Sequence, residues 1–415
     1  MRVDLLSFQQ KALGQLRLRL NSAISSYRAD FIPQILSFTA PTGAGKTIIM
    51  AALVESVFNG DELFIHAQGK TAVFPEMPDS VFLWLSDSPE LNEQSKAKFD
   101  LKADRLRLGQ CIILDDSFKG ERLEDGHIYF LNTQKLGVNS NLTKHSDNRQ
   151  HTIWEVLQNT VSEKRERLIV IIDEFTVLYN CIKKGVASED LLHNWKAIQE
   201  SDQTNFATIF IGHDITPTFF AEPYATNAAA IIERYPVSYL DTESAKELIE
   251  RPILADGKTR FDAKAVERIL YYTAGSPWYL QIFMQEMVKY INDTEVITVT
   301  DIDVYNVAQR FITKQVESLS KTEDFSSLIN SGLDNRFTVI KDAQFVSVLR
   351  GIAKGSEGLE WCDYAWLQKM PGLALEAPLD VILKDLEDRK VIERKDNNQL
   401  IKIKVGLFKE WLIRN

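Results

Sequence analysis

The sequence is poor in cysteine, with only Cys111, Cys181 and Cys362 among its 415 residues. The three lie far apart, form no C-x-x-C pair and have no histidine cluster beside them. A disulfide framework and a structural zinc site are therefore excluded as the basis of the fold. Each cysteine is expected to be a small, buried, apolar side chain.

Long apolar runs and an excess of positive charge are lacking as well. No stretch approaches the roughly 18 apolar residues that a membrane span needs, and residues 1–4 do not have the form of a secretory signal. We therefore expect a cytoplasmic protein. Because 48 Lys and Arg face 58 Asp and Glu, any nucleic acid must bind in a local groove rather than to the overall field.

What the sequence does contain is a phosphate-binding pattern, Ala40-Pro41-Thr42-Gly43-Ala44-Gly45-Lys46-Thr47, between an apolar run at 35–38 and a helix-forming run at 48–54. Strand, glycine loop and helix in this order are typical of a P-loop. The amides of residues 42–47 and the helix dipole would hold phosphates, Lys46 would reach the outer phosphates, and Thr47 would hold Mg²⁺. Ala40 replaces the first glycine, so the pattern is the relaxed form.

A second element of the same chemistry is the aliphatic run 168–172, which ends in Asp173-Glu174. Such a run is typical of a parallel strand buried on both faces. Asp173 would hold the Mg²⁺ shell through water, and Glu174 would polarise the attacking water. The two elements together predict an ATP and Mg²⁺ site with Lys46, Asp173 and Glu174 as its catalytic residues.

The stretches "LLSFQQKAL", "TAPTGAGKT", "VFLWLSDSPELNEQSKAKFD" and "GHIYFLNTQKL" resemble the helicase subunit of type III restriction enzymes, a superfamily 2 family, over residues 1–174. The resemblance implies that Gln9 reads the adenine edge. It also implies DNA as a partner, with Gln94, Ser95, Lys96 and Thr133 touching the nucleic-acid backbone. Polar groups at the surface ends of strands are the alternative for these four residues.

After Asp173-Glu174 the chain departs from that family. The family continues with Ala-His, whereas Phe175-Thr176 follows here, and the chain has no Gly-Arg dipeptide of the kind that a second helicase lobe carries. We therefore expect no second lobe and no processive unwinding.

The stretches "DEFTVL", "TIFIGHDITPTFF", "YYTAGSPWYLQIFMQEMVKYIN" and "GLFKEWL" resemble instead the AAA-like ATPases of the STAND group, over residues 175–415. This resemblance implies that His213 senses the γ-phosphate, that Arg234 completes a neighbouring subunit's site, and that Pro277 packs on the nucleotide. A structural histidine, a surface salt bridge and a helix start are the respective alternatives. Arg234 is expected just before a strand at 237–240.

The predicted fold class is α/β, a P-loop NTPase core with a parallel sheet, followed by a helical lid and a winged helix. The predicted domains are the core at 1–240, the lid at 241–320, a polar linker at 321–336 and the winged helix at 337–415. The winged helix follows from three helical spacings and a hairpin signal around Asp396-Asn397-Asn398. Its third helix, 378–389, is rich in Asp and Glu, which favours packing against protein over entry into a DNA groove.

Three hypotheses remain open at this point. The chain is a DNA-dependent ATPase of restriction or defence type with partner subunits, or a STAND-type switch that forms homo-oligomers with ATP. The third hypothesis is a fusion whose two halves fold but are not coupled. Nucleotide binding is common to all three.

Overall fold

The computed structural model describes residues 4–30, 34–41, 43–65, 70–137, 140–163, 168–173, 175, 206–212, 232–236, 239–254, 257–317, 325, 328, 340–373 and 375–414. The chain divides into two compact units, Met1–Ser238 and Tyr239–Asn415, which we describe one at a time. Across the described residues no helix is long and apolar enough to cross a membrane.

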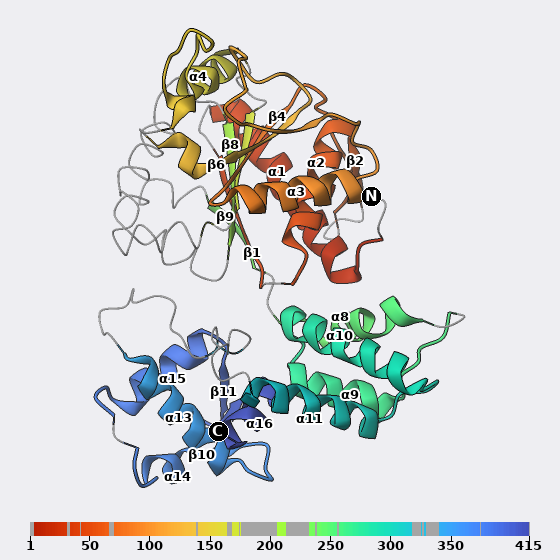
Figure 1. Ribbon diagram of the computed structural model, residues 1–415, viewed down its shortest axis with the longest axis vertical. Coiled ribbons are helices and arrows are strands. Elements are labelled where there is room, and N and C mark those ends of the chain that lie inside the picture. Colours follow the sequence, from red (N-terminus) through yellow and green to blue (C-terminus); the bar gives the residue numbers. More distant parts are fainter. Residues whose placement is uncertain are drawn as a thin grey trace. The chain divides into compact units, whose positions relative to one another are not determined.

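The first unit is built on a parallel sheet (Figure 1). Its strands follow the order β5 (Cys111–Ile113), β6 (Ile128–Asn132), β4 (Val81–Ser86), β7 (Leu168–Ile172), β8 (Phe206–Gly212), β1 (Gln34–Thr39) and β9 (Ile232–Pro236). Every neighbouring pair is parallel. All residues of β4 and β7 are buried, as expected of strands covered on both faces. The predicted parallel core is therefore confirmed.

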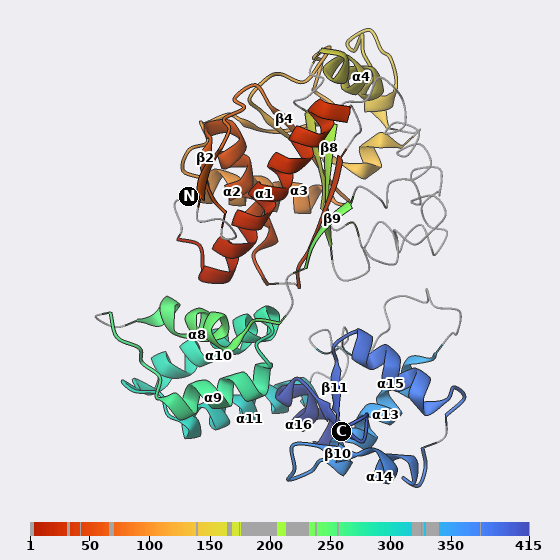
Figure 2. The same cartoon turned by 180° about the vertical axis from the view of Figure 1, so that it is seen from behind.

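Helices α1 (Ser7–Asp30), α2 (Lys46–Asn59) and α3 (Pro89–Lys102) lie together on one side of this sheet, as both views show (Figures 1 and 2). Helix α2 is buried from Ile49 to Phe58, because nearly all its side chains are apolar. Helix α4 (Ile153–Glu163) precedes β7, and two short 3₁₀ turns, η1 (Thr133–Leu136) and η2 (Asn141–Thr143), follow β6. A hairpin of β2 (Asp61–Ile65) and β3 (Lys70–Phe74), which the sequence analysis did not predict, follows α2.

Partly buried polar contacts tie α1 to α2 and to the first residue of β2. Arg17 donates from Nε to Ser56 Oγ (2.9 Å) and from Nη2 to Asp61 Oδ2 (2.5 Å). Burial lowers the pKa of the Arg17 guanidinium, an effect that the adjacent Asp61 opposes. Because Gln9 stands near the start of α1 and Lys46 at the start of α2, this contact helps to fix the two residues relative to each other.

The second unit begins with a group of helices: α8 (Thr242–Glu250), η5 (Arg251–Ile253), α9 (Ala263–Thr273), α10 (Pro277–Thr294) and α11 (Asp301–Glu317). Asp241 caps α8 by accepting from Ser244 N (2.8 Å), and Asp262 caps α9 by accepting from Ala265 N (2.7 Å). Capping carboxylates of this kind satisfy amides that the helix leaves without partners. All of these helices lie within 241–320, the segment that was predicted to be helical.

The remainder of the second unit contains α13 (Asp342–Gly355), β10 (Cys362–Asp363), α14 (Tyr364–Gln368), α15 (Leu379–Asp388), β11 (Ile392–Lys395), β12 (Leu400–Ile403) and α16 (Gly406–Arg414). Strands β11 and β12 form the predicted antiparallel hairpin, and β10 pairs with β12. Asp396, Asn397 and Asn398 form the hairpin turn, all with positive φ of 53° to 69°. Asn and Asp tolerate this conformation better than other non-glycine residues.

Two residues of the segment predicted to be a polar linker, 321–336, are buried instead. Phe325 is fully buried, with its ring centroid 5.3 Å from that of Phe408 and 5.5 Å from that of Trp411. Leu328 is 7% exposed. The polar average of the segment concealed two apolar side chains spaced three residues apart.

Candidate nucleotide site

The phosphate loop joins the end of β1 to the start of α2. Gly43 and Gly45 have φ of 82° and 81°, a backbone conformation that glycine adopts without steric cost. The loop is closed by Ala44 N donating to Pro41 O (3.2 Å), and Ala40 N donates to Gly212 O at the end of β8 (3.1 Å). Gly45 caps α2 with no side-chain hydrogen bond, which leaves the amides of the first helical turn to an anion.

Gln9 lies against this loop from α1. Its Oε1 accepts from Leu6 N (3.0 Å), and its Nε2 donates to Ala44 O (3.2 Å). A Cβ atom on Gly45 would stand 2.5 Å from Gln9 Nε2. The structure thus brings Gln9 next to Gly45, 36 positions away in sequence. Position 45 requires glycine.

Lys46 folds back over the loop, where Nζ donates to Ala40 O at 3.2 Å. Thr47 follows in the first turn of α2 and is partly exposed. Thr42 lies outside the described residues. The cradle is therefore made of backbone amides, one ammonium and one hydroxyl, which is the donor set that a triphosphate with Mg²⁺ requires.

Asp173 stands at the same edge of the same sheet. In register, Ile172 of β7 pairs with Phe210 of β8, which in turn pairs with Ser37 of β1. One strand, β8, separates β7 from β1, so their ends are about 10 Å apart at ordinary strand spacing. Asp173 N donates to Leu85 O (2.9 Å), which fixes the residue at the end of β4.

The small number of candidate protein ligands at this edge also fits the usual coordination of Mg²⁺. No group of three His, Cys, Asp or Glu side chains able to hold a metal occurs among the described residues. Mg²⁺ usually takes only one or two protein ligands and completes its shell with waters and phosphates. Thr47 and Asp173 are suited to be those ligands. Glu174, the predicted catalytic base, lies outside the described residues.

The other predicted residues are placed as follows. Arg234 lies within β9 (Ile232–Pro236), where its backbone pairs with Ser37, and not just before a strand as predicted. Pro277 is buried at the first position of α10, in the second unit, after Gly275 with φ of 71°. His213 lies outside the described residues.

Of the predicted nucleic-acid contacts, Gln94 on α3 is exposed and Thr133 is partly exposed at the end of β6. Lys96 is partly exposed and pairs with Asp100 (2.6 Å). Ser95 is 4% exposed, so its side chain faces the interior of the unit. Because Ser95 lies on the inner face of α3, its hydroxyl is not placed to touch a nucleic-acid backbone, in contrast to the other three residues.

A polar network at these strand ends was missed by the sequence analysis. Ser86 Oγ contacts Asn92 Oδ1 (2.8 Å), while Asn132 Nδ2 and Gln134 Nε2 both donate to Asp87 O (3.4 and 3.3 Å). The network links the end of β4 to the end of β6. The signal in the sequence was a polar residue directly after each apolar run.

Residues 2–208 match the family model described as "Type III restriction enzyme, res subunit". The resemblance predicted for the front of the chain is therefore confirmed. The match runs on through β7 to Thr208 in β8, beyond residue 174, where the resemblance was expected to end. Sheet, loop and family match together identify the first unit as a P-loop NTPase core.

Similar solved structures are distant in sequence. The Aeropyrum pernix ORC2 protein is 14% identical, with 93% of this chain and 94% of that chain covered and a TM-score of 0.44. Cdc6p from Pyrobaculum aerophilum is 12% identical, with coverage of 100% and 95% and a TM-score of 0.40. A variant of RuvB from Thermotoga maritima is 12% identical, with coverage of 95% and 93% and a TM-score of 0.39. No curated protein matches the chain.

Proposed function

We propose that the chain binds ATP with Mg²⁺ and hydrolyses it slowly. The observation that carries this proposal is the juxtaposition of the phosphate loop and Asp173, one strand apart at the carboxyl edge of one parallel sheet. Had the two segments lain on different sheets or at opposite edges, no shared magnesium-nucleotide pocket would be possible.

In this proposal each residue has a separate task. The amides of residues 42–45 and the start of α2 hold the phosphates, and Lys46 neutralises the charge that develops on the outer ones. Thr47 and Asp173 would hold Mg²⁺, which would supply positive charge that offsets the charge of the phosphates. Glu174, directly after Asp173 in sequence, orients and polarises the attacking water. Gln9 reads the adenine edge from its place beside Ala44.

The test is the steady-state ATPase rate of the full chain beside Lys46→Ala, with Lys98→Ala on the exposed face of α3 as the matched control. Lys46→Ala should lower the rate by at least about 100-fold, the range for losing a transition-state contact. Its thermal unfolding should change little because Lys46 is at the surface of the loop. Equal rates for Lys46→Ala and Lys98→Ala would refute the assignment.

We further propose that DNA stimulates hydrolysis, in keeping with the res-subunit match, with the exposed position of Gln94 and with the partly exposed position of Thr133 at the carboxyl edge. Lys96 would exchange Asp100 for a phosphate. Adding single-stranded or double-stranded DNA should raise the ATPase rate, and Lys96→Ala should reduce that stimulation and leave the basal rate unchanged. A rate that is indifferent to both kinds of DNA would remove the nucleic-acid part of the proposal.

One observation favours a second candidate, the STAND-type switch. The described residues of 239–415 contain helices and a three-stranded antiparallel sheet, and no parallel sheet that could serve as a second helicase lobe. In this alternative the helices are a lid, Pro277 packs on the nucleotide and Arg234 completes a neighbouring subunit's site. Light scattering should then show oligomers with ATP and Mg²⁺ that are lost with ADP and in Arg234→Ala. A monomer under all conditions would exclude it.

We also propose that residues 337–415 form a winged helix that contacts protein rather than DNA. Three basic side chains on and after α15 are paired internally: Lys384 with Asp388 (2.7 Å), Arg389 with Asp385 (2.6 Å) and Arg394 with Glu387 (2.5 Å). A helix whose cations are already paired has little charge to offer phosphates.

A further inference from the structure

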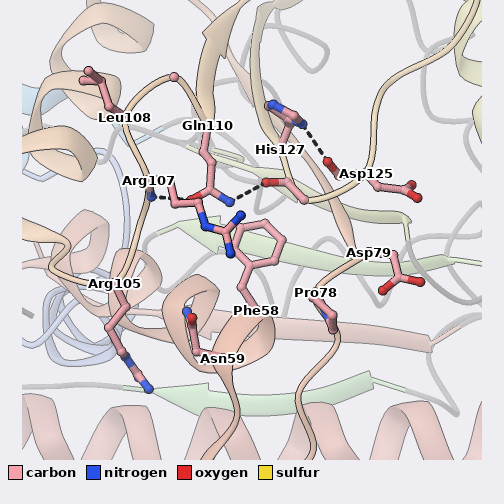
Figure 3. Close-up of a pocket in the computed structure, with 12 residues that line it drawn as sticks. Phe58, Asn59, Pro78, Asp79, Arg105, Arg107, Leu108, Gln110, Asp125 and His127 are labelled. Atoms are coloured by element: carbon pink, nitrogen blue, oxygen red, sulfur yellow. Dashed lines mark hydrogen bonds between the residues drawn. The ribbon is translucent and has the colours of Figure 1, made fainter.

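A cavity of about 540 Å³ lies at the other edge of the first unit's sheet (Figure 3). Its lining loops directly precede strands: Pro78-Asp79 precedes β4, 107–110 precedes β5, and 125–127 precedes β6. The C-terminal end of α2, at Phe58 and Asn59, completes it. Strands of five or six residues separate this amino edge from the phosphate loop by roughly 15–20 Å. The cavity is therefore separate from the nucleotide site.

The walls of the cavity are fixed by hydrogen bonds between the loops. Gln110 accepts from Arg107 N through Oε1 and donates from Nε2 to Gly126 O (2.7 Å). Gly126 N donates to Ser80 O (2.9 Å). Gly126 has φ of 70°, and a Cβ there would stand 3.1 Å from Pro78 O, so the turn needs glycine. A site held in this way is largely formed before a ligand arrives, which lowers the cost of binding.

Arg107 supplies a cation that is available to a ligand. Its guanidinium has no partner among the residues that the structure describes, and Figure 3 shows it extending inward from its loop to the middle of the lining group. Arg105, by contrast, points away and is engaged by Asp61 (2.9 Å) and Gly60 O (3.1 Å). Of the two arginines, Arg107 is the one placed to bind an anion, and its planar fork suits a phosphate or carboxylate.

Hydrogen-bond acceptors stand on the opposite side. Figure 3 places Asp79 and Asp125 on that side, with their carboxylates at the outer edge of the lining group. His127 Nδ1 lies 2.6 Å from Asp125 O, and because a carbonyl only accepts, Nδ1 carries the hydrogen and Nε2 of the neutral ring is an acceptor. This side of the cavity repels a second anion and favours hydroxyl or amino groups.

We propose that this cavity binds a small monophosphate that carries hydroxyl groups, a sugar phosphate or a nucleoside monophosphate. The phosphate binds Arg107, and the hydroxyls donate to Asp79, Asp125 and His127 Nε2. The volume lies in the usual range for small-ligand sites, about 300–1,000 Å³. A polyanion would meet the two carboxylates, and a neutral sugar would leave Arg107 unused, so neither class fits as well.

The test is calorimetric titration of the full chain with ribose 5-phosphate and with AMP, and with inorganic phosphate and ribose as comparisons. All titrations are repeated in Lys46→Ala, which removes phosphate binding at the P-loop. Ribose 5-phosphate should bind equally well in both backgrounds. Arg107→Gln should weaken it by at least about tenfold, the effect of losing a charge-assisted pair, whereas Arg122→Gln, an exposed arginine outside the cavity, should not.

Asp79→Ala provides a second readout of opposite signs. It should weaken the binding of ribose 5-phosphate, because a hydroxyl group loses its partner. It should strengthen the binding of inorganic phosphate, because a repelling charge is removed. AMP bound as tightly as ribose 5-phosphate would assign recognition to the phosphosugar, and tighter AMP would add the base, so both results support the class. Three results overturn it: no binding of either probe, equal affinities in Arg107→Gln and Arg122→Gln, or inorganic phosphate bound as tightly as ribose 5-phosphate.

Discussion

The two proposed sites at the edges of the first unit's sheet would hold an anion in different ways. At the carboxyl edge the phosphate loop uses backbone amides that two positive-φ glycines turn inward, with one lysine beside them. At the amino edge the cavity uses side chains from four separate segments, and its one free cation among the described residues is Arg107. A backbone site depends on a short contiguous pattern, whereas a side-chain site depends on long-range folding.

This difference decides which changes matter at each edge. A backbone cradle tolerates no Cβ in the space that the anion or its neighbours need, but it draws little stability from any one side chain. A side-chain cavity depends on the contacts that hold its loops, so its weak points are buried polar groups such as Glu55. The following predictions test this contrast, from the largest expected effect to the smallest.

Gly45→Ala should abolish nucleotide binding, with a loss of affinity of at least about 100-fold. The new Cβ would stand 2.5 Å from Gln9 Nε2, and alanine would have to adopt φ of 81°. The loop must then shift away from the geometry that presents its amides. Equilibrium binding of a fluorescent ATP analogue measures the effect. Gln9→Ala combined with Gly45→Ala removes the collision but not the backbone strain, so any recovery of affinity in the double variant isolates the collision.

How much of this site could be predicted follows from the same contrast. The P-loop and Asp173 were readable because strand, glycines, lysine and acidic strand end are contiguous signals, and one sheet then brings two such signals together. The assignment of Gln9 to the nucleotide site was expected only through the family resemblance, and its contact with Ala44 was not expected. The cavity was not predicted at all, because Arg107, Asp79 and His127 have no common pattern in sequence and meet only once the strands are ordered.

Cys111, adjacent to the cavity residue Gln110, should be about 100-fold or more slower to alkylate in the folded chain than in urea at pH 9. Burial, reinforced by Asp100, raises the pKa of its thiol to about 12, so the folded state holds little of the reactive thiolate. Because the pKa of Cys111 is higher in the folded than in the unfolded chain, its contribution to the free energy of unfolding is complete below pH 9. That contribution is lost as the pH rises toward 12. Site-resolved mass spectrometry after iodoacetamide treatment measures the rate. Similar rates in native buffer and in urea would show that the amino edge opens readily.

Glu55→Gln should lower the free energy of unfolding by about 1–3 kcal/mol, the cost of weakening charge-assisted bonds to a buried group. The Glu55 carboxylate is 1% exposed and accepts from the amides of Asp104 and Arg105, so it holds the loop that leads to the cavity. Urea unfolding measures the loss, with the exposed Glu93→Gln on α3 as control. ATP affinity should stay within about twofold. A large loss of ATP affinity with unchanged stability would contradict the separation of the two edges.

The fold beyond the first unit shows the same limit on prediction in another form. The helical character of 241–320, where α8, α9 and α10 lie, and the β11–β12 hairpin were predicted, the hairpin because the Asp-Asn-Asn turn marks its end. Phe325 was assigned to a linker because its neighbours are polar, although four aromatic rings surround it. The composition of the residues around Phe325 cannot show that its ring packs into an aromatic cluster formed by residues distant in sequence.

Gly109→Ala is the counterpart of Gly45→Ala and should have the smallest effect. Gly109 lines the cavity with φ of 91°, so alanine there carries a backbone cost of about 1–2 kcal/mol, comparable to that at Gly45. However, a Cβ at Gly109 meets no atom within 4 Å, so no contact is displaced. The midpoint temperature of thermal unfolding should therefore fall slightly, while the affinity for ATP stays unchanged. If Gly109→Ala reduced ATP affinity as strongly as Gly45→Ala, the loss in both variants would reflect general destabilisation, and the special role of the backbone at the carboxyl edge would be refuted.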